Sequence, residues 1–194
     1  MSREILRPCD YLWISWKDNP DENKKKDRMD WIFPLIFSLI VCLVLFTVYH
    51  LNFTCLNSCK KILFNNDAFN IILNFLQTMP GFYIAALAAI STFNNPGMDK
   101  EMVGSTPIDK DRKKMTRRRF LAQSFSYLTF LSIVLLIFGA IIKYFFSLDI
   151  VIINSYLFLS SYLIISFILF VFLFQLVFIT FYCLYYLGDR IHLP

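Results

Sequence analysis

The sequence predicts an all-α membrane protein, a four-pass transmembrane helical bundle that assembles as a homo-oligomer. The chain of 194 residues has a mean hydropathy of +0.56, and only 17% of its residues are charged. That composition is too apolar for an ordinary soluble domain of this length. Four windows also exceed the roughly 18 apolar residues that suffice for a helix to cross about 30 Å of hydrocarbon. The bilayer is therefore the expected solvent.

The four windows differ in how they begin and in what interrupts them. The first begins with Trp31 and soon reaches Pro34, which are typical of an interface anchor and of the first turn of a helix. A cleavable signal peptide is not expected, because the preceding segment is charged and no small-residue cleavage site is present. The last window has no charge between Ile150 and Gly188, and it contains no Gly or Pro for a buried reversal. One long helix is therefore expected there.

These observations divide the chain into alternating spans and loops. The expected segments are an N-terminal cytoplasmic segment 1–30, a first span 31–51, a periplasmic loop 52–67, a second span 68–93, a basic cytoplasmic loop 94–119, a third span 120–146, a short periplasmic loop 147–152, a fourth span 153–187 and a cytoplasmic tail 188–194.

Lys and Arg are distributed unevenly between the two sides of this arrangement. The N-terminal segment holds seven, the central loop holds eight and the tail holds Arg190. The opposite side holds only Lys60, Lys61 and Lys143. Because cationic loops resist translocation, the imbalance predicts that both termini and the central loop lie in the cytoplasm.

The central loop ends in the basic run DRKKMTRRRF, residues 111–120. We interpret these cations mainly as a membrane anchor among lipid phosphates, and binding of nucleic acid is not expected because no aromatic residues alternate with them. The first half of the loop, NNPGMDKEMVGSTP, is rich in turn residues, so docking of a partner protein stays open. The residues that topology places toward such a partner are Pro96, Asp99, Glu101, Lys113, Lys114, Arg117, Arg118 and Arg119.

Large apolar side chains also occur outside any span, in YLWISW at 11–16. They need a cover. The lipid headgroup layer is the expected one, because Trp and Tyr prefer that zone, and a soluble partner is the alternative.

The second span carries one narrow stripe of polar and small residues. At about 100° per residue, helical geometry places seven residues on this stripe: Asn70, Asn74, Gln77, Gly81, Ala85, Ala88 and Thr92. Amides in hydrocarbon need partners, and small residues let helices approach closely. The stripe therefore indicates packing within one bundle, a homo-oligomer contact or, less favoured, the lining of a pore.

The sequence offers no catalytic constellation. No acidic residue or Arg lies inside an expected span, and the two histidines, His50 and His192, have no plausible catalytic companion. We therefore expect neither an enzyme nor a bound cofactor or metal. Cys55 and Cys59 on the outer side form a possible disulfide, with two free thiols as the alternative.

One stretch carries a family resemblance. The run ALAAISTFNNPGMDKEMVGSTP, followed by TRRRFLAQSFSYLTFLSI, resembles the membrane subunit of the Kiwa antiphage defence system, and size and topology agree with it. The resemblance covers residues 81–133. It implies a sensor and scaffold in the bacterial inner membrane that forms homo-oligomers, tetramers in that family, and binds a cytoplasmic DNA-binding effector subunit. Phage attachment or injection would be the trigger.

Two functions follow from these observations. The first is a non-enzymatic scaffold or sensor that contacts membrane lipid, copies of itself and a cytoplasmic effector, without binding nucleic acid directly. The alternative is a pore-forming protein, either holin-like or a small channel, because of the polar half of the second span.

Overall fold

The computed structural model describes residues 6–16, 19–54, 63–92, 96–101, 106–110, 112–148 and 155–190. Within these ranges the chain is helical, and its only β features are isolated bridges. Four helices are long and apolar enough to cross a membrane. The predicted all-α, four-span fold is thus confirmed, and the chain is a multi-pass membrane protein; its homo-oligomeric state stays a prediction.

The first long helix begins well before the expected start at Trp31. It consists of α2 (Pro20–Asp27), the π-helical turn η2 (Arg28–Ile32) and α3 (Phe33–Thr54) in direct succession. The side chain of Asn19 accepts a hydrogen bond from the Asp21 backbone N–H at 3.2 Å, and Pro20 occupies the first turn. An N-cap and a proline at this position favour a helix start, so the helix includes a charged first part that hydropathy alone does not register.

The other three long helices are α4 (Asp67–Thr92), α5 (Arg117–Ser147) and α6 (Ser155–Tyr185). The last is a single helix, as predicted, and it continues into the π-helical turn η5 (Tyr186–Arg190). α5 begins before Phe120, because Thr116 caps it by accepting a hydrogen bond from the Arg119 backbone N–H at 3.3 Å. The described residues also form three short 3-10 helices: η1 (Arg7–Trp13), η3 (Leu63–Asn65) and η4 (Pro96–Met98).

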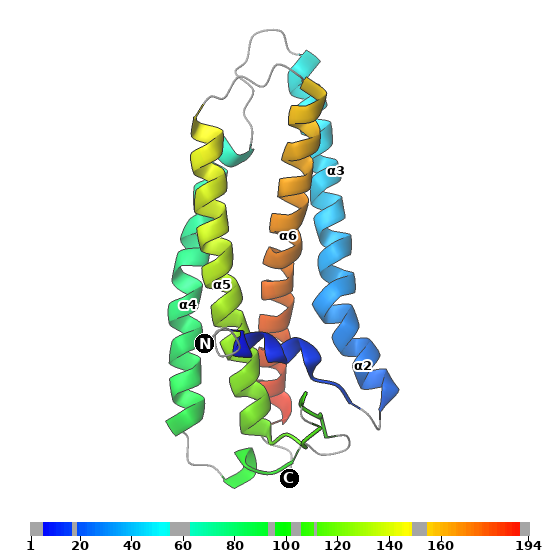
Figure 1. Ribbon diagram of the computed structural model, residues 1–194, viewed down its shortest axis with the longest axis vertical. Coiled ribbons are helices and arrows are strands. Elements are labelled where there is room, and N and C mark those ends of the chain that lie inside the picture. The colour runs from blue at the N-terminus through cyan, green and yellow to red at the C-terminus, as the bar shows by residue number, and fades with distance from the viewer. Residues whose placement is uncertain are drawn as a thin grey trace.

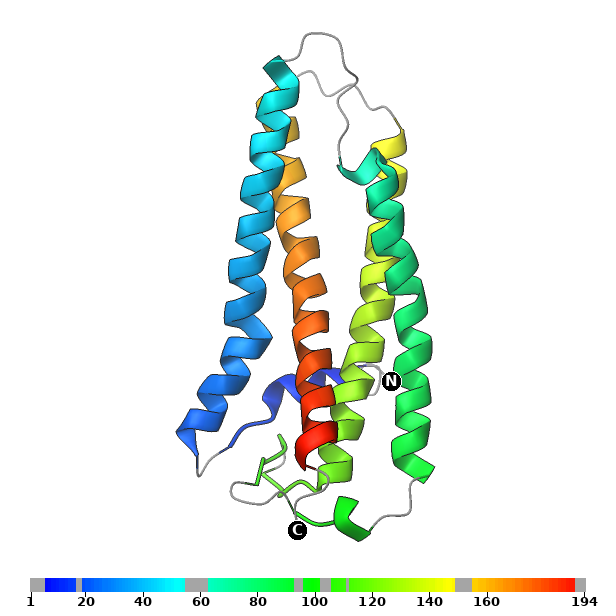
Figure 2. The same ribbon diagram turned by 180° about the vertical axis from the view of Figure 1, so that it is seen from behind.

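The long helices form two neighbouring pairs (Figures 1 and 2). α4 packs on α5, α3 packs on α6, and α5 and α6 contact each other at the centre. In the most apolar part of each helix, 44% of α5 and of α6 is buried but only 11% of α3 and of α4. The two outer helices therefore present most of their apolar side chains to the surroundings, as expected when the surroundings are lipid.

The contact between α4 and α5 is close. Phe69, Leu76 and Tyr83 recur every seventh residue on α4 and are almost completely buried. Opposite them, α5 carries Gly139, where an added Cβ would lie 2.7 Å from Leu73 Cδ2. A small residue at this point permits the close approach that stabilises helix pairs in lipid.

Replacing Gly139 by Leu should therefore lower the thermal unfolding midpoint of the detergent-solubilised protein by several degrees, because overpacking destabilises by roughly 1–3 kcal/mol. Gly188→Leu at the end of the last long helix is the matched control, since nothing lies within 4 Å of a Cβ at that position. Equal losses from both variants would show that the contact at Gly139 does not limit stability.

Candidate functional site

Near one end of the bundle, the long helices are covered by other parts of the chain, with the N-terminal segment lying across α5 and α6 (Figure 1). The cover consists of residues 6–16 and the described parts of the loop between α4 and α5, and we call it the cap. Backbone hydrogen bonds join its two parts: Ser15 N–H donates to Ile108 O at 3.2 Å, and Ile108 N–H donates to Ser15 O at 2.8 Å. Arg117 N–H donates to Lys100 O at 3.2 Å, which fixes the loop to the start of α5.

The aromatic N-terminal segment lies on α5. Tyr11 and Trp16 are 1% and 3% exposed. The Tyr11 ring stacks on Tyr127 at a centroid distance of 5.2 Å, and Trp16 meets Phe120 edge-on at 6.1 Å. The expected covers were lipid headgroups or a partner. The chain's own helix covers these two residues instead, because Phe120 and Tyr127 in the first turns of α5 face the N-terminal segment.

Arg118 binds groups of the protein itself. Its Nε lies 2.9 Å from Asp99 Oδ1, and its Nη2 donates to Asp99 Oδ2 at 3.2 Å. Its Nη1 donates to the backbone carbonyls of Ile90 and Ser91 at 3.2 and 3.3 Å. A bidentate guanidinium contact of this kind is strong and directional. Arg118 thus closes the C-terminal end of α4, whose last carbonyls lack helical partners.

Other cations of the basic run are also paired within the cap. Arg119 forms an ion pair with Asp109, and Lys114 with Glu101 at 3.3 Å. Arg117 is only 3% exposed. These arginines therefore have partners within the protein, and their contact with lipid phosphates stays a prediction. Alternating acids and bases in the loop made this pairing possible, although the sequence did not show which residues pair.

Of the residues placed toward a partner, Lys113 remains exposed, and within the part of the chain that the structure describes no carboxylate pairs with it. Asp99 and Glu101 are exposed but carry ion pairs, and Pro96 begins η4. The structure thus brings the predicted loop residues together at one end of the bundle, with most of their charge already neutralised.

The first long helix contains a buried ion pair that the sequence analysis did not predict, and Tyr11 of the cap bonds to it. Lys26 Nζ lies 2.9 Å from Asp30 Oδ2, with the two side chains 6% and 2% exposed. Tyr11 O–H donates to Asp30 Oδ1 at 3.2 Å, and Lys26 Nζ lies 4.9 Å from the Tyr11 ring centroid. Burial, followed by the Asp30 charge, raises the pKa of Tyr11 well above its usual value, so the phenol stays a neutral donor. The four-residue spacing of Lys26 and Asp30 was the available signal.

Polar contacts between helices continue inside the bundle. Tyr127 O–H on α5 donates to Gln175 Oε1 on α6 at 3.1 Å. The buried side chain of Gln175 thus bonds a neighbouring helix. Near the other end, Lys143 Nζ donates to Asn70 Oδ1, which joins α5 to α4. These bonds fix the facing sides of helices for which lipid supplies no partners.

The predicted stripe on the second span lies mostly outside the helix contacts of the single chain. Asn70 is half-buried, whereas the other six stripe residues are exposed: Asn74, Gln77, Gly81, Ala85, Ala88 and Thr92. The hydroxyl of Thr92 bonds within its own helix, to Ala88 O at 2.9 Å. α5 packs instead on the neighbouring face of α4 that carries Phe69. Cys55 and Cys59 lie outside the described residues.

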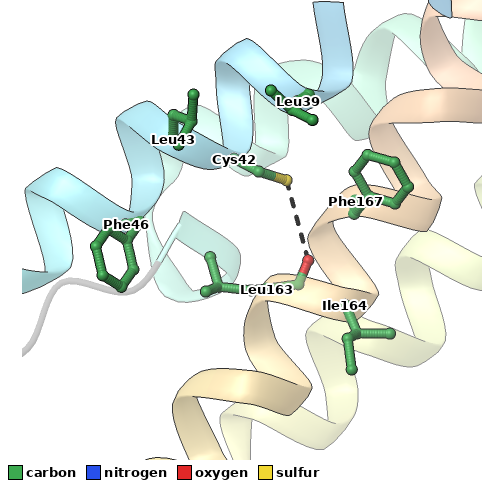
Figure 3. A pocket seen from close by; sticks show the side chains of 7 residues that line it. All are labelled: Leu39, Cys42, Leu43, Phe46, Leu163, Ile164 and Phe167. Atoms are coloured by element: carbon green, nitrogen blue, oxygen red, sulfur yellow. Dashed lines mark hydrogen bonds between the residues drawn. The ribbon is translucent and has the colours of Figure 1, made fainter. Parts of the chain in front are cut away.

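An apolar groove of about 480 Å³ runs between α3 and α6 (Figure 3). Its lining is aliphatic and aromatic except for Cys42, whose Sγ lies 4.0 Å from the Leu163 carbonyl oxygen. Phe46 and Phe167 border it from the two helices. With no charged group in its lining, the groove suits the hydrocarbon of the membrane and offers no chemistry for catalysis.

No known protein family, curated protein or solved structure matches the chain. Its class follows from the geometry alone: a multi-pass helical membrane protein with a folded polar cap at one end of the bundle. Its most distinctive polar feature is the buried contact among Lys26, Asp30 and Tyr11, since it joins the cap to a long helix.

Replacing Lys26 by Met should destabilise the protein by about 3 kcal/mol, because Asp30 would remain as an uncompensated buried charge. The double variant Lys26→Met, Asp30→Leu should regain most of the loss, since removing both charges is often neutral. Thermal unfolding in detergent measures both effects, with Lys24→Met as the control because Lys24 is 69% exposed. A double variant as unstable as the single one would contradict this account.

Proposed function

We propose that the chain is a non-enzymatic membrane scaffold and sensor of the Kiwa type, which recruits a cytoplasmic effector subunit in response to phage attachment or injection. The resemblance of residues 81–133 supports the family, and these residues comprise the second half of α4, the loop and the first half of α5. The loop within this stretch is part of the folded cap. A folded loop is typical of a docking surface, whereas a topology signal needs only its charges.

The observation that carries the proposal is an exposed aromatic group on the cap. Trp13 is 65% exposed, although Tyr11 and Trp16 beside it are buried. Leu6, also on the cap, is 56% exposed, and Lys110 Nζ lies 5.7 Å from the Trp13 ring centroid. Exposed Trp with basic neighbours is typical of the centre of a protein interface. The effector subunit docks on this surface of the cap.

Cation asymmetry orients the proposed complex. The cap and the N-terminal half of the first long helix carry most of the Lys and Arg residues, so the positive-inside rule places them in the cytoplasm of a bacterial inner membrane. The exposed stripe around Gly81 and Ala85 supplies the contact between copies of the chain, tetramers by the resemblance. Several effector subunits would then be held side by side.

A pore is the second candidate, and the exposure of Asn74 and Gln77 favours it. If copies of the chain meet through the stripe, these amides face one another across the assembly axis. The stripe carries no charge that would select an ion. The scaffold therefore remains the preferred function.

The first test is Trp13→Ala in the full-length protein, expressed with the soluble product of a neighbouring gene and captured from detergent. Loss of a central interface tryptophan should weaken capture by about 2 kcal/mol. The membrane protein itself should stay folded, because most of the Trp13 side chain contacts nothing in the cap.

Trp31→Ala is the matched control, since Trp31 is also exposed, at 42%, but lies at the start of the apolar helix. Undiminished capture by the Trp13 variant would remove this surface from the proposal. A deletion of residues 96–110 would be a poorer test, because Asp99 and Ile108 hold the cap together.

The second test separates scaffold from pore through Asn74→Leu. A scaffold keeps its effector and leaves the membrane potential of the host intact, with or without the substitution. A pore should lower the potential when the wild-type chain is expressed, and Asn74→Leu should reduce that effect at least several-fold. Membrane-potential dye fluorescence with and without phage challenge measures it, and depolarisation sensitive to Asn74 would refute the scaffold.

A further inference from the structure

A second pocket lies beside the cap, between the first long helix and the end of α6. It has a volume of about 360 Å³ and is partly open. Aromatic side chains form one side, with Trp16 from the cap and Tyr182, Tyr185 and Tyr186 from the end of α6 and from η5. Both π-helical turns, η2 and η5, contribute to the lining. Such turns are rare and are frequently found at functional sites.

The charges in the lining favour an anion. Lys25 and Arg28 contribute two positive charges and Glu22 one negative charge, which leaves one net positive charge. Lys25 Nζ lies 3.0 Å from Glu22 Oε1. Arg28 is exposed, and within the described ranges no carboxylate pairs with it, in contrast to Arg118 in the cap. The planar guanidinium of Arg28 is thus available, and its donors match a phosphate group.

The pocket spans the change from a charged to an apolar environment. Phe33 N–H donates to Arg28 O across the π-turn, so the two residues lie one above the other on the same helix. Met29 and Phe33 line the apolar part, and beyond Phe33 the helix exposes Leu35 and Ile36 at 42% and 49%. Tyr and Trp around such a boundary are typical of the membrane interface. A ligand here meets cations at one end and hydrocarbon at the other.

We propose that this pocket binds the headgroup of an anionic phospholipid, with its phosphate at Arg28 and Lys25 and the start of its acyl chains along Met29 and Phe33. One phosphodiester charge balances the net charge of the lining. A free nucleotide fits less well, because the lining offers no amide side chain to read a base edge, and Met29 and Phe33 add an apolar part that a nucleotide does not need.

The test uses the full-length protein in an uncharged detergent, titrated with short-chain phosphatidylglycerol while the thermal unfolding midpoint is recorded. The midpoint should rise and saturate, because a ligand of the folded state stabilises it. Arg28→Gln should weaken the apparent affinity about fivefold, as expected for one phosphate-binding cation near the membrane surface. Arg112→Gln is the matched control, since Arg112 is also an exposed arginine but lies in the loop of the cap and does not line the pocket.

Three further titrations identify the source of the phosphate. Phosphatidylcholine, inorganic phosphate and adenosine monophosphate should each leave the midpoint almost unchanged at the concentrations that saturate with phosphatidylglycerol. Equal stabilisation by phosphatidylcholine would show that no anionic headgroup is selected. A response to inorganic phosphate or the nucleotide equal to that of the lipid, or equal affinity losses in Arg28→Gln and Arg112→Gln, would overturn the proposal.

Discussion

The absence of hydrogen-bond partners in hydrocarbon determines most of this structure. Every backbone polar group within the membrane has to be satisfied inside the chain, which leaves continuous helices as the solution for the four apolar windows. The same constraint concentrates the remaining polar chemistry at the helix ends. There, Arg118 satisfies the last carbonyls of α4, and Lys26 and Asp30 neutralise each other out of contact with water. The cap and the helix ends supply the polar partners that these groups need.

Hydrophobic burial has a different role in the two parts of the protein. Between the long helices it adds little, because lipid is as apolar as the neighbouring side chains, and close packing around Gly139 together with the bond from Tyr127 to Gln175 fixes the arrangement. In the cap, the contacts of Tyr11 with Tyr127 and of Trp16 with Phe120 bury the apolar surface of a segment that lies outside the long helices. The cap thus packs on the first turns of α5.

The sequence predicted the helices better than the site, for physical reasons. Helix number followed from hydropathy, because a single long apolar segment satisfies its backbone groups within itself only as a helix. The start at Pro20 was missed, since a charged helical turn leaves no hydropathy signal even though Asn19 and Pro20 are an N-cap pattern. The pairing of Arg118 with Asp99 depends on the path of the loop between them, which no local rule specifies. For the stripe on α4, periodicity identified a face of polar and small residues. It could not show that α5 packs instead on the face that carries Phe69, Leu76 and Tyr83.

Trp16 connects the pocket that contains Arg28 to the loop of the cap. Its backbone is held by Asn23 of α2, whose side chain accepts from Trp16 N–H and donates to Trp16 O, both at 2.7 Å. Its ring lines the pocket that contains Arg28, and the next residue back, Ser15, pairs with Ile108 in the loop. A shift of α2 relative to α6 would therefore displace Trp16 and, through Ser15, the loop of the cap. Because these contacts are direct and short, the pocket that contains Arg28 and the outer surface around Trp13 belong to one connected unit of the structure.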